Sequence, residues 1–238
     1  MKATYAIPTA NPPLADACLA RWQGMGYATA VLVDGHDHCA FEFQHADMII
    51  HSPDYRGWPH ATNTLCRVTS TEIVVVGGDD IWPDETMRAD DIAAQFVEHF
   101  GGTFGVMQPT GDRFMPNGDG VPASERVAYS PWFGREFIER AYGGIGPVCE
   151  SYYHFFSDEE IQAYAMTLDI FWQRPDVIQH HDHWTRTGRR RPDYMHKAQA
   201  HWKDDKATFA QRQVVRFPPW RQRTPNENAE REARRAQG

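Results

Sequence analysis

The sequence predicts an α/β fold with a mostly parallel sheet flanked by helices, followed by a helical C-terminal extension. Two observations lead to this prediction. Apolar runs of strand length alternate with amphipathic helical segments along the first half of the chain, which is typical of parallel sheets. Three of these runs end in polar, turn-forming residues, and parallel sheets bind ligands beyond the carboxyl ends of their strands.

The chain is expected to begin with a strand and a helix. Thr4–Ile7 is an apolar strand that ends at Pro8. A helix over Leu14–Met25 follows, because its apolar residues recur on one face. Asn11 is expected to cap this helix, and Pro12 takes its first position, where no N–H is needed.

Three more strands and a second helix complete the first half. Thr29–Val33 is continuously apolar and ends at a turn that begins with Asp34, so we expect a strand buried on both faces. Asp47–His51 is a further expected strand. Ile73–Val76 consists of four β-branched residues and is the clearest strand of the chain, and Ala89–Phe100 shows helical periodicity.

The pattern is looser beyond residue 103. We expect a strand at Phe104–Gln108, a polar loop at Asp112–Ala128 and helices at Phe133–Tyr142, Asp158–Trp172 and Lys197–Gln213. The tail Thr224–Gly238 is polar and charged, and it is expected to be helical only in part or disordered.

Bulk composition describes a chain that can fold by itself. The 238 residues are 41% hydrophobic and 13% aromatic, which is enough for a substantial core. No apolar run approaches the roughly 20 residues of a membrane-spanning helix. The N-terminus lacks a signal-peptide pattern, so we expect a cytoplasmic protein. The cysteines are widely spaced and are expected to be reduced; they are Cys18, Cys39, Cys66 and Cys149.

Charge is unevenly distributed along the chain. Residues 184–238 hold 14 Lys and Arg against 6 Asp and Glu, whereas residues 1–183 hold 10 against 26. This asymmetry indicates either a basic surface for an anionic partner or a solvated helix. Basic residues interleaved with tryptophans can also hold nucleic acid by phosphate contact and stacking. The residues concerned are Arg186, Arg189, Arg190, Arg191, Trp202, Arg216, Trp220, Arg221 and Arg223.

The first candidate for chemistry is the turn Gly77–Asp80, directly after the clearest strand. Its two carboxylates, Asp79 and Asp80, are ligands that Mg²⁺ and Mn²⁺ prefer, and its two glycines let the backbone approach a ligand closely. Asp and Gly also favour turns without any function, so a purely structural turn is the alternative.

Two further clusters carry ionisable groups. His180–His183 contains three histidines and an aspartate, which suit Mn²⁺, Zn²⁺ or Fe²⁺, although a solvated loop is the alternative. His181 and His183 point the same way if this segment is extended. Asp158 and Glu159 follow Ser157, and they either stabilise a helix N-terminus or provide a general base.

In this order, these residues resemble the family-2-type glycosyltransferases of the GT-A fold, over residues 2 to 184 or about three quarters of the chain. The first strand and turn, with Pro8, Thr9 and Asn11, resemble the segment that meets the nucleotide in this family. Asp34 corresponds to the acidic residue that the family places near the base. Gly57–Asn63 resembles the glycine-to-asparagine segment before the metal-binding strand, which implies a role for Asn63.

The resemblance also covers the metal and acceptor sides. Gly77 stands where the family has the first aspartate of its DxD motif, so the resemblance leaves Gly78, Asp79 and Asp80 for the diphosphate and the metal. It implies His181 or His183 as a metal ligand, Asp158 or Glu159 as the catalytic carboxylate, and Trp132, Arg135 and Gly144 as acceptor-side residues.

The function implied by this resemblance is sugar transfer from a nucleoside diphosphate sugar, most often UDP-linked, with Mn²⁺ or Mg²⁺ and inversion at the anomeric carbon. Residues 1–184 would form the GT-A domain, with a nucleotide-sugar half over about 1–110 and an acceptor half over about 111–184, and residues 185–238 a basic helical extension. A hydroxymethylated base of viral DNA is one candidate acceptor, because of the basic extension. A His/Asp metal hydrolase and a non-catalytic nucleotide-sugar-binding module are the alternatives.

Overall fold

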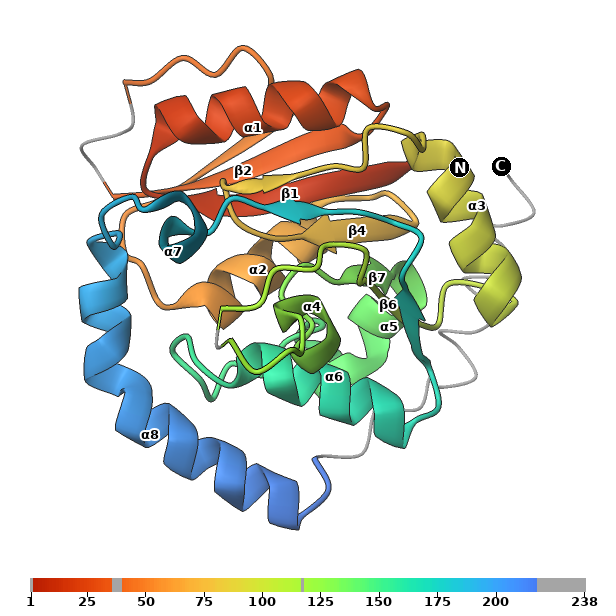
Figure 1. The fold of residues 1–238 in the computed structure, drawn as a ribbon, viewed down its shortest axis with the longest axis vertical. Helices are drawn as coiled ribbons and strands as arrows, with labels where there is room; N and C mark the ends of the chain where they lie inside the picture. Colours follow the sequence, from red (N-terminus) through yellow and green to blue (C-terminus); the bar gives the residue numbers. More distant parts are fainter. Residues whose placement is uncertain (1, 36–39, 117, 218–238) are drawn as a thin grey trace.

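The computed structural model describes residues 2–35, 40–116 and 118–217, and within them the chain forms one large sheet between two layers of helices (Figure 1). The strand order is β3-β2-β1-β4-β7-β6-β8, and every strand except the antiparallel β7 runs parallel to β1. The strands are β1 (Ala3–Thr9), β2 (Ala28–Asp34), β3 (Met48–Ser52), β4 (Ile73–Val76), β6 (Val106–Pro109), β7 (Trp132–Gly134) and β8 (Phe171–Arg174). This is the predicted α/β fold with a mostly parallel sheet.

The two faces of the sheet bury alternate residues of each strand, as the period of two requires. Tyr5 and Ile7 of β1 face one helical layer, whereas Ala6 faces the other. The first layer holds α1 (Pro12–Gly24) and α3 (Ala89–Phe100), and Trp22 of α1 stacks on Tyr5 with ring centroids 3.7 Å apart. The second layer holds α2 (Trp58–Val68), α5 (Arg135–Arg140) and α6 (Ser157–Thr167).

Several predicted elements are confirmed. The strand and helix bounds of β1, α1, β2, β3, β4, α3 and β6 match the predicted segments to within a few residues. The side chain of Asn11 caps α1, where it accepts a hydrogen bond from the N–H of Leu14 at 3.4 Å. Local periodicity was sufficient here because each segment packs in the way that its own apolar pattern favours.

Two predicted helices are partly wrong. The start of Phe133–Tyr142 is strand β7, which pairs with β4 and β6, and the end of Asp158–Trp172 is strand β8 at the sheet edge. Helix α2 was not predicted at all. Short apolar segments fit either structure, and the partner strands decide which one forms.

The C-terminal part of the described chain is helical and packs against the domain. It comprises α7 (Trp184–Thr187) and α8 (Tyr194–Val214), which includes the predicted helix Lys197–Gln213. Asp205 of α8 is buried and accepts hydrogen bonds from three consecutive N–H groups, those of residues 153–155, at 2.8–3.0 Å. The predicted tail Thr224–Gly238 lies outside the described residues.

Two remaining predictions concern cysteines and membranes. Cys18, Cys66 and Cys149 are buried free thiols, and Cys39 lies outside the described residues. Within the described ranges, no helix is both long enough and apolar enough to cross a membrane.

Candidate active site

The carboxyl ends of β1, β2 and β3 enclose a cavity of about 450 Å³. Asp34 ends β2 and lines this cavity, and Tyr55 from the segment after β3 contributes an aromatic wall. Lys197 of α8 also lines the cavity; the other lining residues are Ala10, Gly35, Pro53 and Asp54. Helix α7 and the start of α8 lie on the same side of the molecule as these strand ends (Figure 1).

The turn after β4 lies beside this cavity, because β4 pairs with β1. Its first residue, Gly77, is buried, and a Cβ atom there would lie 2.8 Å from Oη of Tyr5 and 3.1 Å from Oγ of Ser130. Oη of Tyr5 donates to the carbonyl of Gly78 at 2.7 Å and so fixes the turn. Packing therefore explains why a glycine stands where a first aspartate was expected by resemblance.

Asp79 is held against the end of β1. Oγ1 of Thr9 donates to Oδ2 of Asp79 at 2.7 Å, and the N–H of Asn11 donates back to Oγ1 of Thr9 at 2.9 Å. Burial raises the pKa of the Asp79 carboxyl to about 6, although the hydrogen bond from Thr9 acts in the opposite direction. The first predicted nucleotide-contacting turn and the acidic turn are thus one hydrogen-bonded unit.

Asp80 meets the histidine cluster through a small second sheet. Strand β5 (Ile81–Trp82) pairs antiparallel with β9 (His180–His181), and the N–H of Asp182 donates to the carbonyl of Asp80 at 2.8 Å. Nε2 of His181 then lies 3.5 Å from Oδ1 of Asp80. Burial acts to raise the pKa of Asp80, but the hydrogen bond and charge of His181 outweigh it, and the pKa is lowered.

His183 lies next to His181, with ring centroids 5.1 Å apart. Its Nδ1 atom lies 2.7 Å from Oγ1 of Thr185, which leaves Nε2 as its other ligand atom. Burial and the neighbouring His181 lower the pKa of His183, so the neutral imidazole that can bind a metal is favoured.

His181 is positioned by residues that sequence patterns did not single out. Oδ2 of Asp112 accepts from the N–H of His181 at 2.9 Å, and Nη1 of Arg186 donates to the same oxygen at 2.8 Å. The ring of Tyr129 stacks on that of His181 with centroids 5.0 Å apart. Asp112 and Tyr129 belong to a loop without periodicity, so only the folded arrangement reveals them.

The first turn of α6 carries the predicted catalytic carboxylates. Burial and the adjacent Asp158 raise the pKa of Glu159 to about 9, and its Oε2 atom has no hydrogen-bond partner among the described residues. Glu160 points inward and pairs with Tyr152 and Arg212. The burial of Glu159 and the pairing of Glu160 tie both residues to the fold, and the role of Asp158 as a base stays a prediction.

Four predicted residues lie away from the strand-end edge or are used by the fold. Asn63 is fully buried and bonds the backbone of Val148 through both ends of its amide. Arg135 follows the end of β7 at the amino ends of the parallel strands, where it donates to the carbonyls of residues 66 and 71. Trp132 is buried inside the sheet, and Gly144 ends a short 3₁₀ turn after α5.

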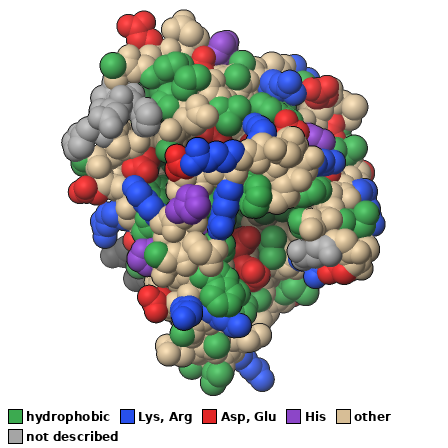
Figure 2. Space-filling model, turned by 60° about the vertical axis from the view of Figure 1, so that its left-hand side comes forward, with side chains coloured by type: hydrophobic (Ala, Val, Ile, Leu, Met, Phe, Trp, Pro, Cys, Tyr) green, Lys and Arg blue, Asp and Glu red, His purple; other side chains and the backbone are tan. Residues whose placement is uncertain are grey.

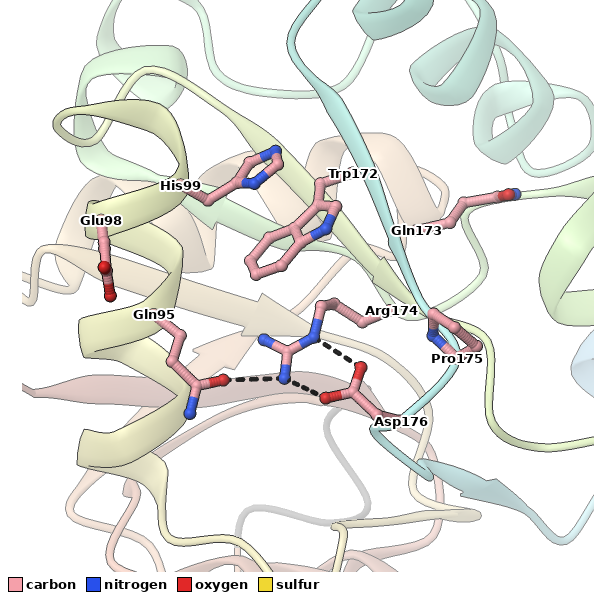
Figure 3. A pocket seen from close by; sticks show the side chains of 8 residues that line it. All are labelled: Gln95, Glu98, His99, Trp172, Gln173, Arg174, Pro175 and Asp176. Carbon is pink, nitrogen blue, oxygen red and sulfur yellow. Dashed lines mark hydrogen bonds and ion pairs between the residues drawn. The ribbon is translucent and has the colours of Figure 1, made fainter.

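A second cavity, of about 510 Å³, lies between α3 and the edge strand β8 (Figure 3). It shares no lining residue with the strand-end cavity. Arg174 in its wall is engaged within the protein, since it donates to Gln95 at 2.8 Å and to Asp176 at 2.7 Å. The larger of the two cavities is lined by none of the predicted site residues, whereas Asp34 lines the strand-end cavity.

Figure 2 brings the strand-end side of the molecule forward. Lys, Arg and His side chains border a hollow in the middle of this face, and Asp and Glu side chains are visible inside it. Positive charge around recessed carboxylates suits a ligand that combines an anion with a metal ion.

Two solved glycosyltransferase structures have a fold similar to that of this chain. The mannosyltransferase PcManGT from Pyrobaculum calidifontis, in complex with GDP-Man and Mn²⁺, matches with a TM-score of 0.53 and 19% identity, over 75% of this chain and 56% of that one. TarS 1-349 of S. aureus in complex with UDP matches with a TM-score of 0.55 and 14% identity, over 75% of this chain and 59% of that one. The chain has the GT-A glycosyltransferase fold. No protein-family model matches the sequence, and no curated protein does.

Both matches are low in sequence identity and cover only part of each chain. At such identities the likeness concerns the GT-A fold alone, and the chain spans less than two thirds of the length of either neighbour. The predicted GT-A scaffold is confirmed, whereas the roles of the individual site residues stay predictions.

Proposed function

We propose that this GT-A domain is a metal-dependent glycosyltransferase that moves a sugar from a nucleoside diphosphate sugar to an acceptor hydroxyl. The proposal rests on two features that lie at the carboxyl ends of neighbouring strands. They are the cavity beyond β1–β3 and the acidic turn after β4. Neighbouring strands lie about 4.8 Å apart, so β2 and β4 are separated by roughly 10 Å. That separation suits a nucleotide whose base and diphosphate occupy the two features.

The nucleotide would be bound by residues from successive strand ends. Asp34 accepts a hydrogen bond from the nucleoside in the cavity, and Pro8 and Asn11 shape the turn after β1. The diphosphate lies against Gly78 and Asp79, where the backbone comes close because Gly78 has no side chain. UDP-linked donors are the first to test, since TarS was solved with UDP, and GDP-linked donors are the second.

Asp79, Asp80 and His181 would hold Mn²⁺ or Mg²⁺, with His183 as a further candidate ligand. Within the described residues, no three His, Cys, Asp or Glu side chains are grouped closely enough to bind an ion by themselves. Diphosphate oxygens would therefore complete the ligand set, as is common for Mg²⁺ sites. When bound, the metal neutralises the negative charge that develops on the leaving diphosphate.

Asp158 is the proposed base. Glu159 keeps its proton at neutral pH because its pKa is raised to about 9, so it cannot accept another. The carboxylate of Asp158 takes the proton of the acceptor hydroxyl while that oxygen attacks the anomeric carbon and the bond to the diphosphate breaks. Attack opposite the leaving group gives inversion at this carbon.

The experiment is nucleotide release from a panel of UDP- and GDP-sugars, with Mn²⁺ or with a chelator. We expect release only with the metal, and its loss in Asp79→Ala. Release that persists with the chelator, or in Asp79→Ala, would contradict the metal site. Full activity of the Asp158→Asn variant would overturn only the assignment of Asp158 as the base. Tight metal binding without any nucleotide binding would instead favour the hydrolase, and nucleotide binding without release the non-catalytic module.

The acceptor proposal rests on fewer contacts. Nucleic acid with a hydroxymethylated base stays a candidate, but two arginines of the basic extension are used by the fold. Arg186 pairs with Asp112, and Arg212 pairs with Glu160. Arg190, whose side chain is 85% exposed, remains accessible. A salt titration of DNA binding tests this proposal, because phosphate contacts weaken steeply with salt; binding that is absent or insensitive to salt would exclude it.

A further inference from the structure

The segment between α7 and α8 connects the neighbourhood of the acidic turn with the strand-end cavity. Nη2 of Arg189 donates to the carbonyl of Asp182, the residue whose N–H bonds the carbonyl of Asp80. Five residues later, the ring of Tyr194 lies 5.9 Å from that of His154, and Lys197 lines the cavity beside Asp34. One short segment of the C-terminal extension therefore runs from the acidic turn to the nucleoside cavity.

Helix α8 is held firmly in this position. Asp205 accepts three backbone N–H bonds from residues 153–155, and both guanidinium bonds of Arg212 go to the buried Glu160, at 2.7 and 2.8 Å. The ring of His201 also stacks on Tyr153, with centroids 4.0 Å apart. These contacts fix where the first turns of α8 lie relative to the strand ends.

Among the described residues that line the cavity, Lys197 is the only one with a cationic side chain. It makes no hydrogen bond or ion pair within residues 2–35, 40–116 and 118–217, although its ammonium group has three donors. Asp34 and Asp54 line the same cavity and would repel a phosphate there, whereas the ring of Tyr55 offers a surface for a base. The cavity thus suits the uncharged nucleoside part of a nucleotide.

We infer that Lys197 is a nucleotide-binding residue supplied by the C-terminal extension, and that its ammonium donates to the nucleoside part of the sugar donor. The inference rests on the proposed function and adds to it that the extension belongs to the donor site. It also separates two roles by position: Lys197 acts on the nucleoside, and Asp79 acts on the diphosphate two strands away.

The test compares Lys197→Met with Lys203→Met. Lys203 is an exposed lysine of the same helix that lines neither cavity. Affinities for UMP, UDP, GMP and GDP with Mn²⁺ are measured by calorimetry on the full chain. We expect Lys197→Met to weaken the monophosphate and the diphosphate of the bound base by the same factor, about tenfold, as for one charge-assisted hydrogen bond. Lys203→Met should bind like the unsubstituted protein, and Lys197→Arg should recover part of the loss.

Each outcome has a distinct meaning. If the unsubstituted protein binds none of the four nucleotides, the proposed function fails and the inference fails with it. If it binds them and Lys197→Met binds equally well, only the inference is overturned. A larger loss for the diphosphate than for the monophosphate would show a phosphate contact and overturn the nucleoside assignment. Asp79→Asn should show that opposite pattern, losing affinity for the diphosphate alone.

Discussion

Nε2 of His181 lies 3.5 Å from Oδ1 of Asp80, although the two residues come from opposite halves of the chain. The pairing of Ile81 with His181 between β5 and β9 produces this contact. It joins a turn that follows the central strand β4 to a segment that follows the edge strand β8. The candidate metal site therefore depends on the second sheet as much as on the acidic turn.

Removal of His181 should weaken metal binding. In His181→Ala, Asp80 loses the largest of the influences that lower its pKa, and the candidate metal site loses one imidazole nitrogen. We expect Mn²⁺ affinity in the presence of UDP to fall at least tenfold, measured by titration with electron paramagnetic resonance. The exposed His196 of α8 provides the control, since His196→Ala should leave Mn²⁺ affinity unchanged. Equal Mn²⁺ affinity in both variants would argue against His181 as a ligand.

An aspartate at position 77, where the family has the first residue of its DxD motif, should destabilise the folded protein. In Gly77→Asp the new Cβ would lie 2.8 Å from Oη of Tyr5 and 3.1 Å from Cδ1 of Ile81, inside the buried end of β4. Overpacking of this kind costs about 1–3 kcal/mol, so thermal unfolding should occur several degrees lower. Gly24→Ala is the control, because nothing lies within 4 Å of its added Cβ. A stable Gly77→Asp protein with tighter Mn²⁺ binding would disprove the steric explanation.

Stability should fall with rising pH because of Glu159. Its pKa in the folded protein is about 9, above the ordinary value of 4.5, so the folded state binds the proton more tightly than the unfolded chain. This contribution is complete below about pH 4.5 and is lost as the pH rises toward 9.

Substitution by glutamine should flatten this dependence. We expect Glu159→Gln to exceed the unsubstituted protein in stability at pH 8 but not at pH 4.5, in urea unfolding at several pH values. Glu98→Gln, on the exposed side of α3, should leave the pH dependence as it is. A Glu159→Gln protein whose unfolding follows the unsubstituted curve at every pH would contradict the raised pKa.

The ion pair between Arg212 and Glu160 should couple the stability of α8 to that of α6. Arg212→Met leaves the fully buried Glu160 without its cation, although Oη of Tyr152 still donates to it. Breaking a buried ion pair from one side costs about 3–5 kcal/mol. The double variant Arg212→Met, Glu160→Gln should recover much of that loss in urea unfolding. If the losses in free energy of unfolding of the two single variants simply add in the double variant, the ion pair does not stabilise the position of α8.

Sequence alone determined the scaffold and the acidic turn. The β-branched residues of the apolar runs Thr29–Val33 and Ile73–Val76 favour buried strands, and the carboxyl ends of these strands meet at one side of the sheet because the strands are parallel. Local pattern therefore placed Asp34 and Asp79 at the strand ends, without knowledge of any distant contact.

Tertiary structure decided the rest, because it depends on contacts between residues that are far apart in the chain. The strand β7 exists because β4 and β6 supply its partners, and His181 reaches Asp80 only because β9 pairs with β5. Lys197 lines the strand-end cavity because Asp205 and Arg212 dock α8 on residues 153–160. No periodicity encodes such long-range packing. The sequence therefore placed Asp34 and Asp79 at the strand ends, and only the tertiary structure showed that His181 and Lys197 lie near them.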